Sequence, residues 1–470
     1  MGVFDTAGEA AQAAKDAQKQ LVAQGISSRV KIVDLIKGIC WEKAESWGKL
    51  EFEETRIGRL DDKIEKVQIV KFVPGIEWLA PHGLSGDRGI TLEELAPFVV
   101  IATITPVTHS VPTLAGNIVS MVAAGNGVVF NAHPGAAKCA AEAVAFFNEA
   151  IHRETGIANL VTIVREPSIE SFDELCLSEA VDLICVTGGP AVVNAAMKSG
   201  KRAVCAGPGN PPVVVDETAD LDLAAASIIQ GGGYDNNLLC IGEKQVFVVD
   251  AVHQDFLRAM QKAGAHLLGK SQIQRLAGEV FGEKKDADGR SQPVLNREYV
   301  GADPAVLAKA AGTTCAPGTE LLIAECPFEC PFVQKEQMMP MIPIVPARDS
   351  REAIDMAVRS EHGYKHSAIM HSKNLDNLTL MGRRMDTTLF VKNGPSIAGL
   401  GLGGEGYLNY SIATTTGEGI VTTATFTRRR RCVLVDSDGD APKAHGIDPK
   451  TPLRNIIIAI VDKSVKGVSA

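Results

Sequence analysis

The sequence predicts an α/β protein with a doubly wound parallel sheet. Between residues 98 and 216, short apolar runs rich in β-branched residues alternate with segments of helical spacing. The runs are apolar throughout, as expected for parallel strands that helices cover on both faces. A second pattern of the same kind starts near residue 244 and continues to about residue 425. We therefore expect two α/β domains, with ligands at the carboxyl ends of the strands.

The expected elements follow one another in a regular order. In the first pattern, the strands lie within "FVVIATITP", "GVVFNAHP", "NLVTIVRE", "DLICVTGG", "RAVCAG" and "PPVVVD", and the helices cover 111–124, 135–155, 168–178 and 191–199. In the second pattern, we expect a strand in "KQVFVVD", a helix over 253–268, and strands in "LLIAE" and "TLFVKN". Thr6 and Glu9 form a capping box ahead of an amphipathic N-terminal helix.

Composition and charge exclude several classes of protein. The chain has 470 residues and a net charge of −9, which disfavours nucleic acid as a partner because phosphate contacts need a basic face. Its N-terminus lacks the basic and apolar regions of a signal peptide, and it contains no run of 18 apolar residues that would predict a membrane span. The ten cysteines have neither disulfide-scaffold nor zinc spacing, so we expect reduced thiols, no metal site and a cytoplasmic location.

One cysteine, Cys240 in "DNNLLCIGEK", has unusual neighbours. Asp235, Asn236 and Asn237 are poor strand formers, and the glycines at 231–233 let the backbone come close to a ligand. A polar turn followed by the strand-like "KQVFVVD" is typical of a thiol presented at the start of a strand. The residues alone leave two interpretations open, an inert core thiol and a nucleophile.

Two glycine-rich segments are candidates for binding. In "DLICVTGGPAVV", Thr187, Gly188 and Gly189 lie between an expected strand and a helix, where backbone N–H groups and the helix dipole can bind a phosphate. A plain strand-to-helix turn is an equally good interpretation. Residues 399–406, "GLGLGGEG", contain a GxGxxG pattern but precede the strand-like "YLNYSIATTT" instead of a helix. We interpret them as a close-packing or substrate-loop segment.

Nine segments of the chain carry a resemblance to a known family. They are "ITPVTHSVPTL", "NAHPGAAK", "VTGGPAVV", "GPGNPPVVVDETADL", "DNNLLCIGEKQVFVV", "EQMMPMIPIV", "SAIMHSKN", "FVKNGPSIAGLGLGGEG" and "IATTTGEG". Their types and order over about residues 5–435 resemble the aldehyde dehydrogenase superfamily. Within it, the chain is most similar to the CoA-acylating propionaldehyde and acetaldehyde dehydrogenases of bacterial microcompartments.

The resemblance implies the aldehyde dehydrogenase fold. A Rossmann-like NAD-binding domain would cover residues 1–235, and an α/β catalytic domain would cover residues 236–425. A protruding hairpin at 75–97 and a strand at 426–435 would form an oligomerisation arm. Such an arm implies a homodimer or a tetramer.

The resemblance also implies a catalytic role for Cys240. Its thiolate would attack the aldehyde carbonyl, a hydride would pass to NAD, and the acyl group would remain as a thioester. The backbone N–H of Cys240 would bind the oxyanion. Where many relatives add an asparagine side chain, this chain has His109, which would either donate in its place or lie off the site. The substrate pocket would include Thr108 and Ile412.

The cofactor-binding residues are implied in the same way. Glu336 would accept hydrogen bonds from the nicotinamide ribose, and His133 would bind the adenosine ribose. A loop histidine bonded to water is the alternative interpretation of His133. The remaining residues would line the nicotinamide, the adenosine ribose or the pyrophosphate: Thr105, Pro106, Pro134, Gly135, Thr187, Gly188 and Gly189.

The resemblance also implies the acyl acceptor, because this chain lacks the glutamate general base of the hydrolytic relatives. Ala206 stands where hydrolytic relatives have a glutamate, so water would not be activated and coenzyme A would take the acyl group. Glu243 could replace that base, but in a strand it would point to the face opposite Cys240, and we expect it to form a structural ion pair. Two alternatives stay open, a hydrolytic NAD-dependent dehydrogenase and a non-catalytic microcompartment scaffold.

The C-terminal part continues beyond the resemblance. Residues 436–452, rich in Asp, Gly and Pro, are typical of a linker. From 453 to 470, apolar residues recur at helical spacing, which predicts a short amphipathic tail. The tail would pack on its own subunit or dock on a shell protein or a cargo enzyme, as encapsulation peptides do. The second interpretation places the protein in the lumen of a bacterial microcompartment.

Overall fold

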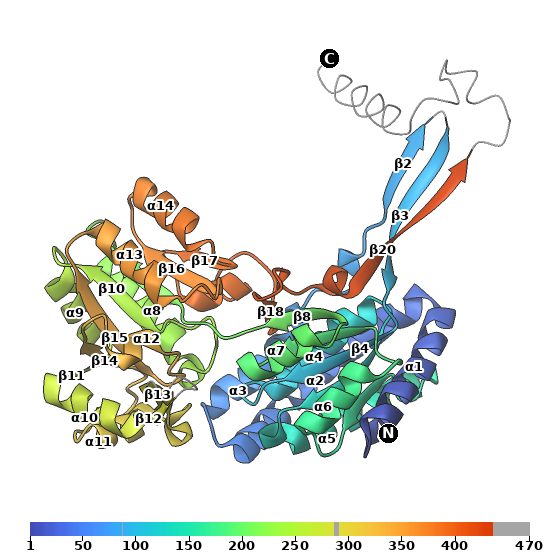
Figure 1. The fold of residues 1–470 in the computed structure, drawn as a ribbon, viewed down its shortest axis with the longest axis horizontal. Coiled ribbons are helices and arrows are strands. Elements are labelled where there is room, and N and C mark those ends of the chain that lie inside the picture. The colour runs from blue at the N-terminus through green and yellow to red at the C-terminus, as the bar shows by residue number, and fades with distance from the viewer. Residues whose placement is uncertain (87, 286–290, 436–470) are drawn as a thin grey trace. The chain divides into compact units, whose positions relative to one another are not determined.

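The computed structural model describes residues 1–86, 88–285 and 291–435. The described chain divides into two compact units, one within residues 1–78 and 97–426 and one within residues 79–96 and 427–435. The first unit contains two parallel sheets, each covered by helices (Figure 1). This is the α/β architecture that the alternating apolar runs predict.

The first sheet has six strands in the order β1-β6-β5-β4-β7-β8, and all of its pairings are parallel. The central strands β4 and β5 are buried along their whole length, because helices cover both faces of the sheet. The strands are β1 (Val3–Phe4), β4 (Val100–Thr105), β5 (Gly127–Ala132), β6 (Val161–Val164), β7 (Leu183–Thr187) and β8 (Arg202–Ala206).

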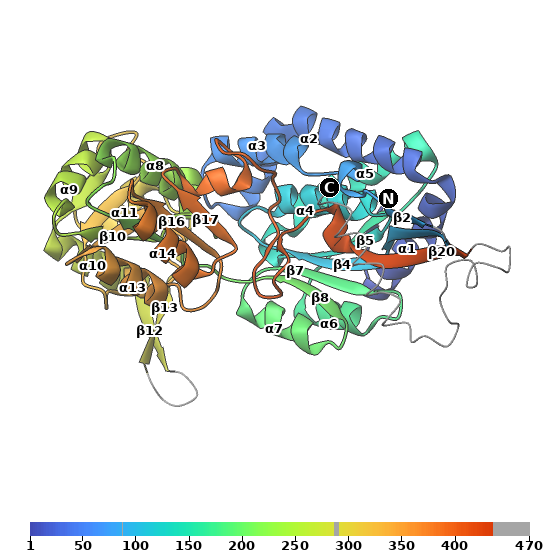
Figure 2. The same cartoon turned by 90° about the horizontal axis from the view of Figure 1, so that it is seen from above.

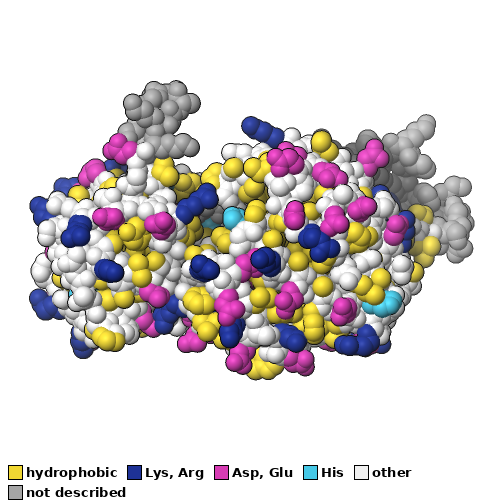
Figure 3. Space-filling view, turned by 90° about the horizontal axis from the view of Figure 1, so that it is seen from below, with side chains coloured by type: hydrophobic (Ala, Val, Ile, Leu, Met, Phe, Trp, Pro, Cys, Tyr) yellow, Lys and Arg dark blue, Asp and Glu magenta, His cyan; other side chains and the backbone are white. Residues whose placement is uncertain are grey.

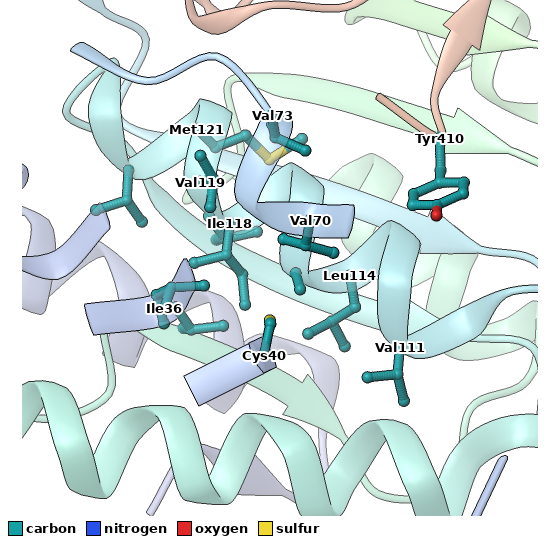
Figure 4. Packing of buried hydrophobic residues seen from close by; sticks show 14 of the residues in the cluster. Ile36, Cys40, Val70, Val73, Val111, Leu114, Ile118, Val119, Met121 and Tyr410 are labelled. Atoms are coloured by element: carbon teal, nitrogen blue, oxygen red, sulfur yellow. The ribbon is translucent and has the colours of Figure 1, made fainter. Parts of the chain in front are cut away.

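Helices α2, α4 and α5 contribute to the core on one face of this sheet, and α1, α6 and α7 to the core on the other (Figure 2). In the first of these cores, Ile36 and Cys40 of α2 pack with Leu114 and Ile118 of α4 (Figure 4). The helices are α1 (Ala7–Gln24), α2 (Ile26–Thr55), α3 (Leu60–Gln68), α4 (Ser110–Ala123), α5 (Ala137–Thr155), α6 (Ile169–Leu177) and α7 (Pro190–Lys198). At the start of α1, the Thr6 hydroxyl accepts the N–H of Glu9 and donates to its carboxylate.

The second sheet has seven parallel strands in the order β11-β14-β15-β10-β9-β16-β17. They are β9 (Pro212–Val215), β10 (Gln245–Val249), β11 (His266–Leu268), β14 (Leu322–Glu325), β15 (Met341–Ala347), β16 (Ser367–His371) and β17 (Leu389–Lys392). One core includes α8 (Leu221–Gly233) and α9 (His253–Lys262). The other includes α10 (Lys270–Val280), α11 (Pro304–Ala310), α12 (Pro331–Gln334), α13 (Ser350–Ser360) and α14 (Leu375–Met385).

Three sequence expectations differ from the observed elements. Strand β9 belongs to the second sheet, so the chain changes sheets between 206 and 212 and not at residue 235. The helix expected over 253–268 ends at Lys262, because Gly264 adopts a φ of +109° that breaks the helix ahead of β11. In the strand-like run after the 399–406 glycines, only Ile412–Ala413 (β18) forms a strand, paired with β19 (Gly419–Ile420).

The segment after β17 returns the chain to the first sheet. The Asn126 side chain donates to the Phe426 carbonyl at 3.0 Å, and the Thr416 hydroxyl accepts the N–H of Cys205 in β8 at 2.9 Å. The remaining short elements are the hairpin β12 (Phe281–Lys285) and β13 (Ser291–Leu295) and the 3₁₀ turns Ile69–Phe72, Ile76–Trp78, Pro134–Ala136, Tyr234–Asn237, Arg297–Tyr299, Ser396–Leu400 and Thr423–Phe426.

The second unit is a three-stranded sheet of β2 (His82–Gly86), β3 (Gly89–Pro97) and β20 (Thr427–Val435). Strands β2 and β3 form an antiparallel hairpin within the expected 75–97 segment, and β20 covers nearly all of the expected 426–435 strand. Arg430 and Arg431 of the basic run pair with Glu94 and Glu93 of β3.

Charged side chains of both signs are interspersed over the face of the molecule shown in Figure 3. Among the helices of the described residues, none combines the length and the apolar character that crossing a membrane requires.

Candidate active site

Cys240 lies in a loop between α8 and β10, and not at the start of a strand as the sequence suggested. After Gly233, the residues Asp235, Asn236 and Asn237 adopt φ values of +46°, +53° and +63°. These residue types tolerate the left-handed conformation, which explains why poor strand formers occupy this position. All three side chains are fully buried. Such a strained run persists only where the surroundings hold it.

Side-chain hydrogen bonds hold this loop. The Asn236 amide donates to the Gly301 carbonyl at 2.9 Å and to the Asp303 carboxylate at 2.8 Å. The Asn237 amide donates to the Glu243 carbonyl at 2.8 Å. The loop is therefore fixed on both sides of the thiol, as a preorganised nucleophile requires.

The Cys240 thiol is half-buried, and three charged groups act on it. Burial, together with the Glu336 carboxylate, raises the pKa of the thiol to about 12, although Lys244 and Lys66 act to lower it. At neutral pH the thiol is therefore protonated, and forming the reactive thiolate requires a proton to leave.

Lys244 lies in the same loop with its whole side chain buried. Its Nζ donates to the carbonyls of Asn237 at 2.8 Å and Leu239 at 3.1 Å. Burial lowers the pKa of Lys244 to about 8, while burial raises the pKa of Glu336 to about 7. Two groups that titrate near neutral pH thus act electrostatically on the thiol, which is typical of a functional site.

His109 is buried at the start of α4, and its Nδ1 lies 2.9 Å from the Thr108 hydroxyl. Burial and the charges of Lys66 and Lys63 hold the pKa of His109 well below its usual range, so the ring is neutral. A neutral ring whose Nδ1 accepts the Thr108 hydroxyl carries its hydrogen on Nε2, where it can donate. Its ring centroid lies 5.5 Å from that of Tyr410.

The residues expected to bind the cofactor lie at the carboxyl ends of β4, β5 and β7, with the exception of Glu336, which lies between α12 and β15. Thr105 ends β4, Thr187 ends β7, and β4 pairs with both β5 and β7. The chain order runs outward in opposite directions from β4, so this is the switch point at which open α/β sheets bind ligands. Gly189 is the N-cap of α7, and a Cβ placed there would meet nothing within 4 Å, which leaves the helix start open to a ligand.

His133 follows β5 directly, and its Nδ1 accepts the N–H of Gly135 at 3.0 Å. Burial, together with the charge of Arg297, lowers the pKa of the His133 imidazole, so the ring is neutral at pH 7. Its ring partner in the structure is thus the backbone of its own turn, which also contains Pro134. Pro106 follows the last residue of β4.

Two further expectations concern the general base that would activate water in a hydrolytic enzyme. Ala206 ends β8, so no side chain that could act as a base stands at that position. Glu243 precedes β10 and lies outside any strand, and its carboxylate accepts the N–H of Ser396 at 2.8 Å and the Ser396 hydroxyl at 2.7 Å. The sequence predicts an ion pair for Glu243, but in the structure Ser396 and not a cation holds its carboxylate. Ile412 is buried in the core against which Cys240 packs.

Sequence reasoning missed three buried ionisable residues near the thiol, namely Lys66, Lys244 and His366. A Cβ at Gly209 would lie 2.7 Å from the Cys240 carbonyl oxygen and 2.9 Å from Cγ of His366, so the histidine is separated from the loop only by this glycine. Burial lowers the pKa of His366 to about 4. No sequence pattern marks the two lysines as buried, because an isolated lysine is exposed in most proteins.

Comparison with known proteins identifies the family. The model of the aldehyde dehydrogenase family matches residues 4–405. The chain is 43% identical to an acetaldehyde dehydrogenase (acetylating), EutE, of Salmonella typhimurium and 40% identical to a propanal dehydrogenase (CoA-propanoylating) of Citrobacter freundii, in each case over 93% of both chains.

Solved structures agree with these relatives. A propionaldehyde dehydrogenase from the fucose utilisation microcompartment of Clostridium phytofermentans superposes with a TM-score of 0.88 at 42% identity, over 93% of this chain and 99% of that one. The Rhodopseudomonas palustris propionaldehyde dehydrogenase, solved with CoA and an acylated cysteine, gives 0.87 at 39% identity, over 92% and 98%. The expected fold is thereby confirmed, and the chain belongs to the aldehyde dehydrogenase family.

Proposed function

We propose that this chain is a CoA-acylating, NAD-dependent aldehyde dehydrogenase that oxidises a short aliphatic aldehyde, with propionaldehyde as the first candidate. The observation that carries the proposal is a preorganised cysteine in a site where Ala206 replaces the hydrolytic base. The relatives named above, which act on acetaldehyde and propanal with an acyl-CoA product, support the substrate class.

The thiol of Cys240 would supply the covalent chemistry. Its sulfur bonds to the carbonyl carbon while its proton leaves, and the oxyanion accepts the N–H of Cys240 and the Nε2–H of His109. Loss of hydride from that carbon converts the thiohemiacetal into a thioester. The CoA sulfur then bonds to the acyl carbon and the Cys240 thiolate leaves, so that aldehyde, NAD⁺ and CoA give acyl-CoA, NADH and a proton.

The cofactor, when bound, accepts the hydride at its nicotinamide ring. The chain offers a fitting site for it at the carboxyl ends of β4, β5 and β7 and at the open start of α7. We assign Thr105, Pro106 and Thr187 to the nicotinamide side and Glu336 to its ribose. His133 takes the adenosine ribose, with Pro134, Gly135, Gly188 and Gly189 around the phosphates and that ribose.

The first prediction tests the reaction itself. We expect NADH formation from C2–C4 aldehydes only when CoA is present, and Cys240→Ala should reduce it to below about one-thousandth while NAD⁺ still binds. In the absence of CoA, intact mass spectrometry should show a persistent acyl-enzyme. Release of free acid at the rate of NADH formation would instead show a hydrolytic enzyme, and an unreactive thiol would favour a scaffold.

The second prediction concerns the thiol. Glu336→Gln removes a negative charge that opposes the thiolate, so the rate of iodoacetamide alkylation at Cys240 should reach half of its maximum at a lower pH. Lys244→Met removes a positive charge and should shift the same profile to higher pH. The control is Glu53→Gln, because Glu53 is an exposed residue of α2. Shifts in the same direction for both variants would contradict these charge assignments.

The third prediction concerns assembly, since we infer that the second unit mediates a homodimer or a tetramer. Its strands expose apolar side chains that include Leu84, Leu92, Val433 and Leu434, and exposed edges of this kind favour pairing with another chain. Light scattering should give two or four times the 49.8 kDa chain mass. Leu92→Lys with Leu434→Lys should lower that mass, and a monomer at micromolar concentration in the unchanged protein would contradict the inference.

The fourth prediction concerns location, because we propose that the enzyme acts in the lumen of a bacterial microcompartment. The supporting segment is the tail at 453–470, which with the 436–452 linker lies outside the described residues. Removing residues 447–470 should leave turnover and particle mass unchanged but abolish co-sedimentation with shell proteins. A truncated enzyme that loses assembly or stability would show that the tail packs on its own subunit.

A further inference from the structure

Four buried charges link the thiol loop to the rest of the first unit. The cluster consists of Glu51 of α2, Lys63 and Lys66 of α3, and Asp235 of the loop, and each side chain is at most 1% exposed. Lys63 Nζ lies 3.3 Å from the Glu51 carboxylate and 3.5 Å from that of Asp235, and Lys66 pairs directly with Asp235. Two positive and two negative charges thus neutralise one another inside the protein.

The cluster contacts both halves of the proposed site. On one side, the Asp235 carboxylate fixes the strained loop that carries the thiol. On the other side, Lys63 donates to the Thr108 carbonyl, and the Glu51 carboxylate accepts the N–H of Val111 at 2.9 Å. Thr108 and Val111 flank His109 at the start of α4, so the same four charges hold the histidine turn and the cysteine loop.

The backbone around Asp235 is shaped to fit its carboxylate. Gly58 has a φ of +82°, and a Cβ there would lie 2.0 Å from the Asp235 carboxylate oxygen. The adjacent Arg59 N–H donates to the same oxygen at 2.8 Å, while the N–H of Asp235 donates to the Asp62 carboxylate at 2.8 Å. Asp235 therefore joins the thiol loop to the turn before α3 by hydrogen bonds in both directions.

The lysines also act on the two reactive groups. The charge of Lys66 lowers the pKa of Cys240, and the charges of Lys66 and Lys63 lower that of His109. Both effects favour the states that the proposed reaction uses, a thiolate and a neutral imidazole. Other titratable groups near the cluster are Arg59, Asp62, Glu65, Cys139, Tyr234 and Tyr410.

Stability alone does not account for this arrangement. Buried ion pairs lose most of their attraction to desolvation, and well-packed apolar residues of similar volume usually stabilise a fold as well or better. A stabilising role does not explain why the cluster contacts both the Thr108 carbonyl and the loop that carries the thiol. A positional role does explain these two contacts.

We propose that Lys63 and Lys66 are positioning residues, which through Thr108 and Asp235 fix the separation and alignment of the His109 ring and the Cys240 thiol. The inference rests on the proposed function. It identifies residues outside the cysteine loop and the cofactor site on which the alignment of the nucleophile and the oxyanion donor depends.

The test compares single variants with a charge-neutral double variant. Lys66→Met and Asp235→Asn each leave an unpaired buried charge and should lower the melting temperature. The double variant restores neutrality and should recover the melting temperature. We expect its kcat to remain about 10- to 100-fold low with an unchanged KM for NAD⁺, because misplaced reacting groups slow the chemical step. Its alkylation profile at Cys240 should shift to higher pH.

A second neutral pair, Glu51→Gln with Lys63→Met, probes the histidine side and should also lower kcat, whether or not the first pair refolds fully. The control is Asp222→Asn with Lys262→Met, because this pair is exposed and 3.0 Å apart. Double variants that recover both melting temperature and kcat would overturn the proposal. If the unchanged protein lacks CoA-dependent turnover, the proposed function fails, whereas an unshifted alkylation profile in the Lys66→Met/Asp235→Asn variant would by itself refute the role of Lys66.

Discussion

The buried carboxylate of Asp235 requires positive partners, and the arrangement of the candidate site depends on the lysines that supply them. It is fully buried in a left-handed stretch of backbone, so an uncompensated charge there would favour unfolding. Lys66 and Lys63 supply the compensation from α3, and Glu51 balances the second lysine from α2. Two helices that precede the first central strand are thereby required for the conformation of a loop nearly two hundred residues later in the chain.

The electrostatics of the thiol follow from the same burial. A half-buried sulfur surrounded by protein resists ionisation, and Glu336 increases that resistance while Lys244 and Lys66 reduce it. The Cys240 thiol therefore stays protonated until the local charge changes. An uncharged thiol reacts slowly with oxidants and alkylating agents, so such a site limits damage to the resting enzyme.

Much of the fold was accessible from the sequence, because strands buried on both faces give continuous apolar runs such as "FVVIATITP". The assignment of β9 to the second sheet was not, since an apolar run does not reveal which neighbour it pairs with. At the site, Cys240 and Glu336 could be named from the resemblance, and their roles stay predictions. The left-handed conformation of Asp235–Asn237, the serine partner of Glu243 and the burial of Lys63 and Lys66 depend on contacts between distant residues, which periodicity and spacing do not contain.

The return of the chain to the first sheet has a consequence for biosynthesis. The side-chain amide of Asn126, at the turn between α4 and β5, donates to the Met121 carbonyl and also to the carbonyl of Phe426, which lies 300 residues later in the chain. Translation proceeds at roughly 5–20 residues per second, so Phe426 is synthesised on the order of 15–60 s after Asn126. During that interval the Asn126 amide has its local partner, the Met121 carbonyl, but lacks the second one, and the apolar surface that the returning segment covers is exposed. The first sheet therefore reaches its final packing only after residue 426 has been synthesised.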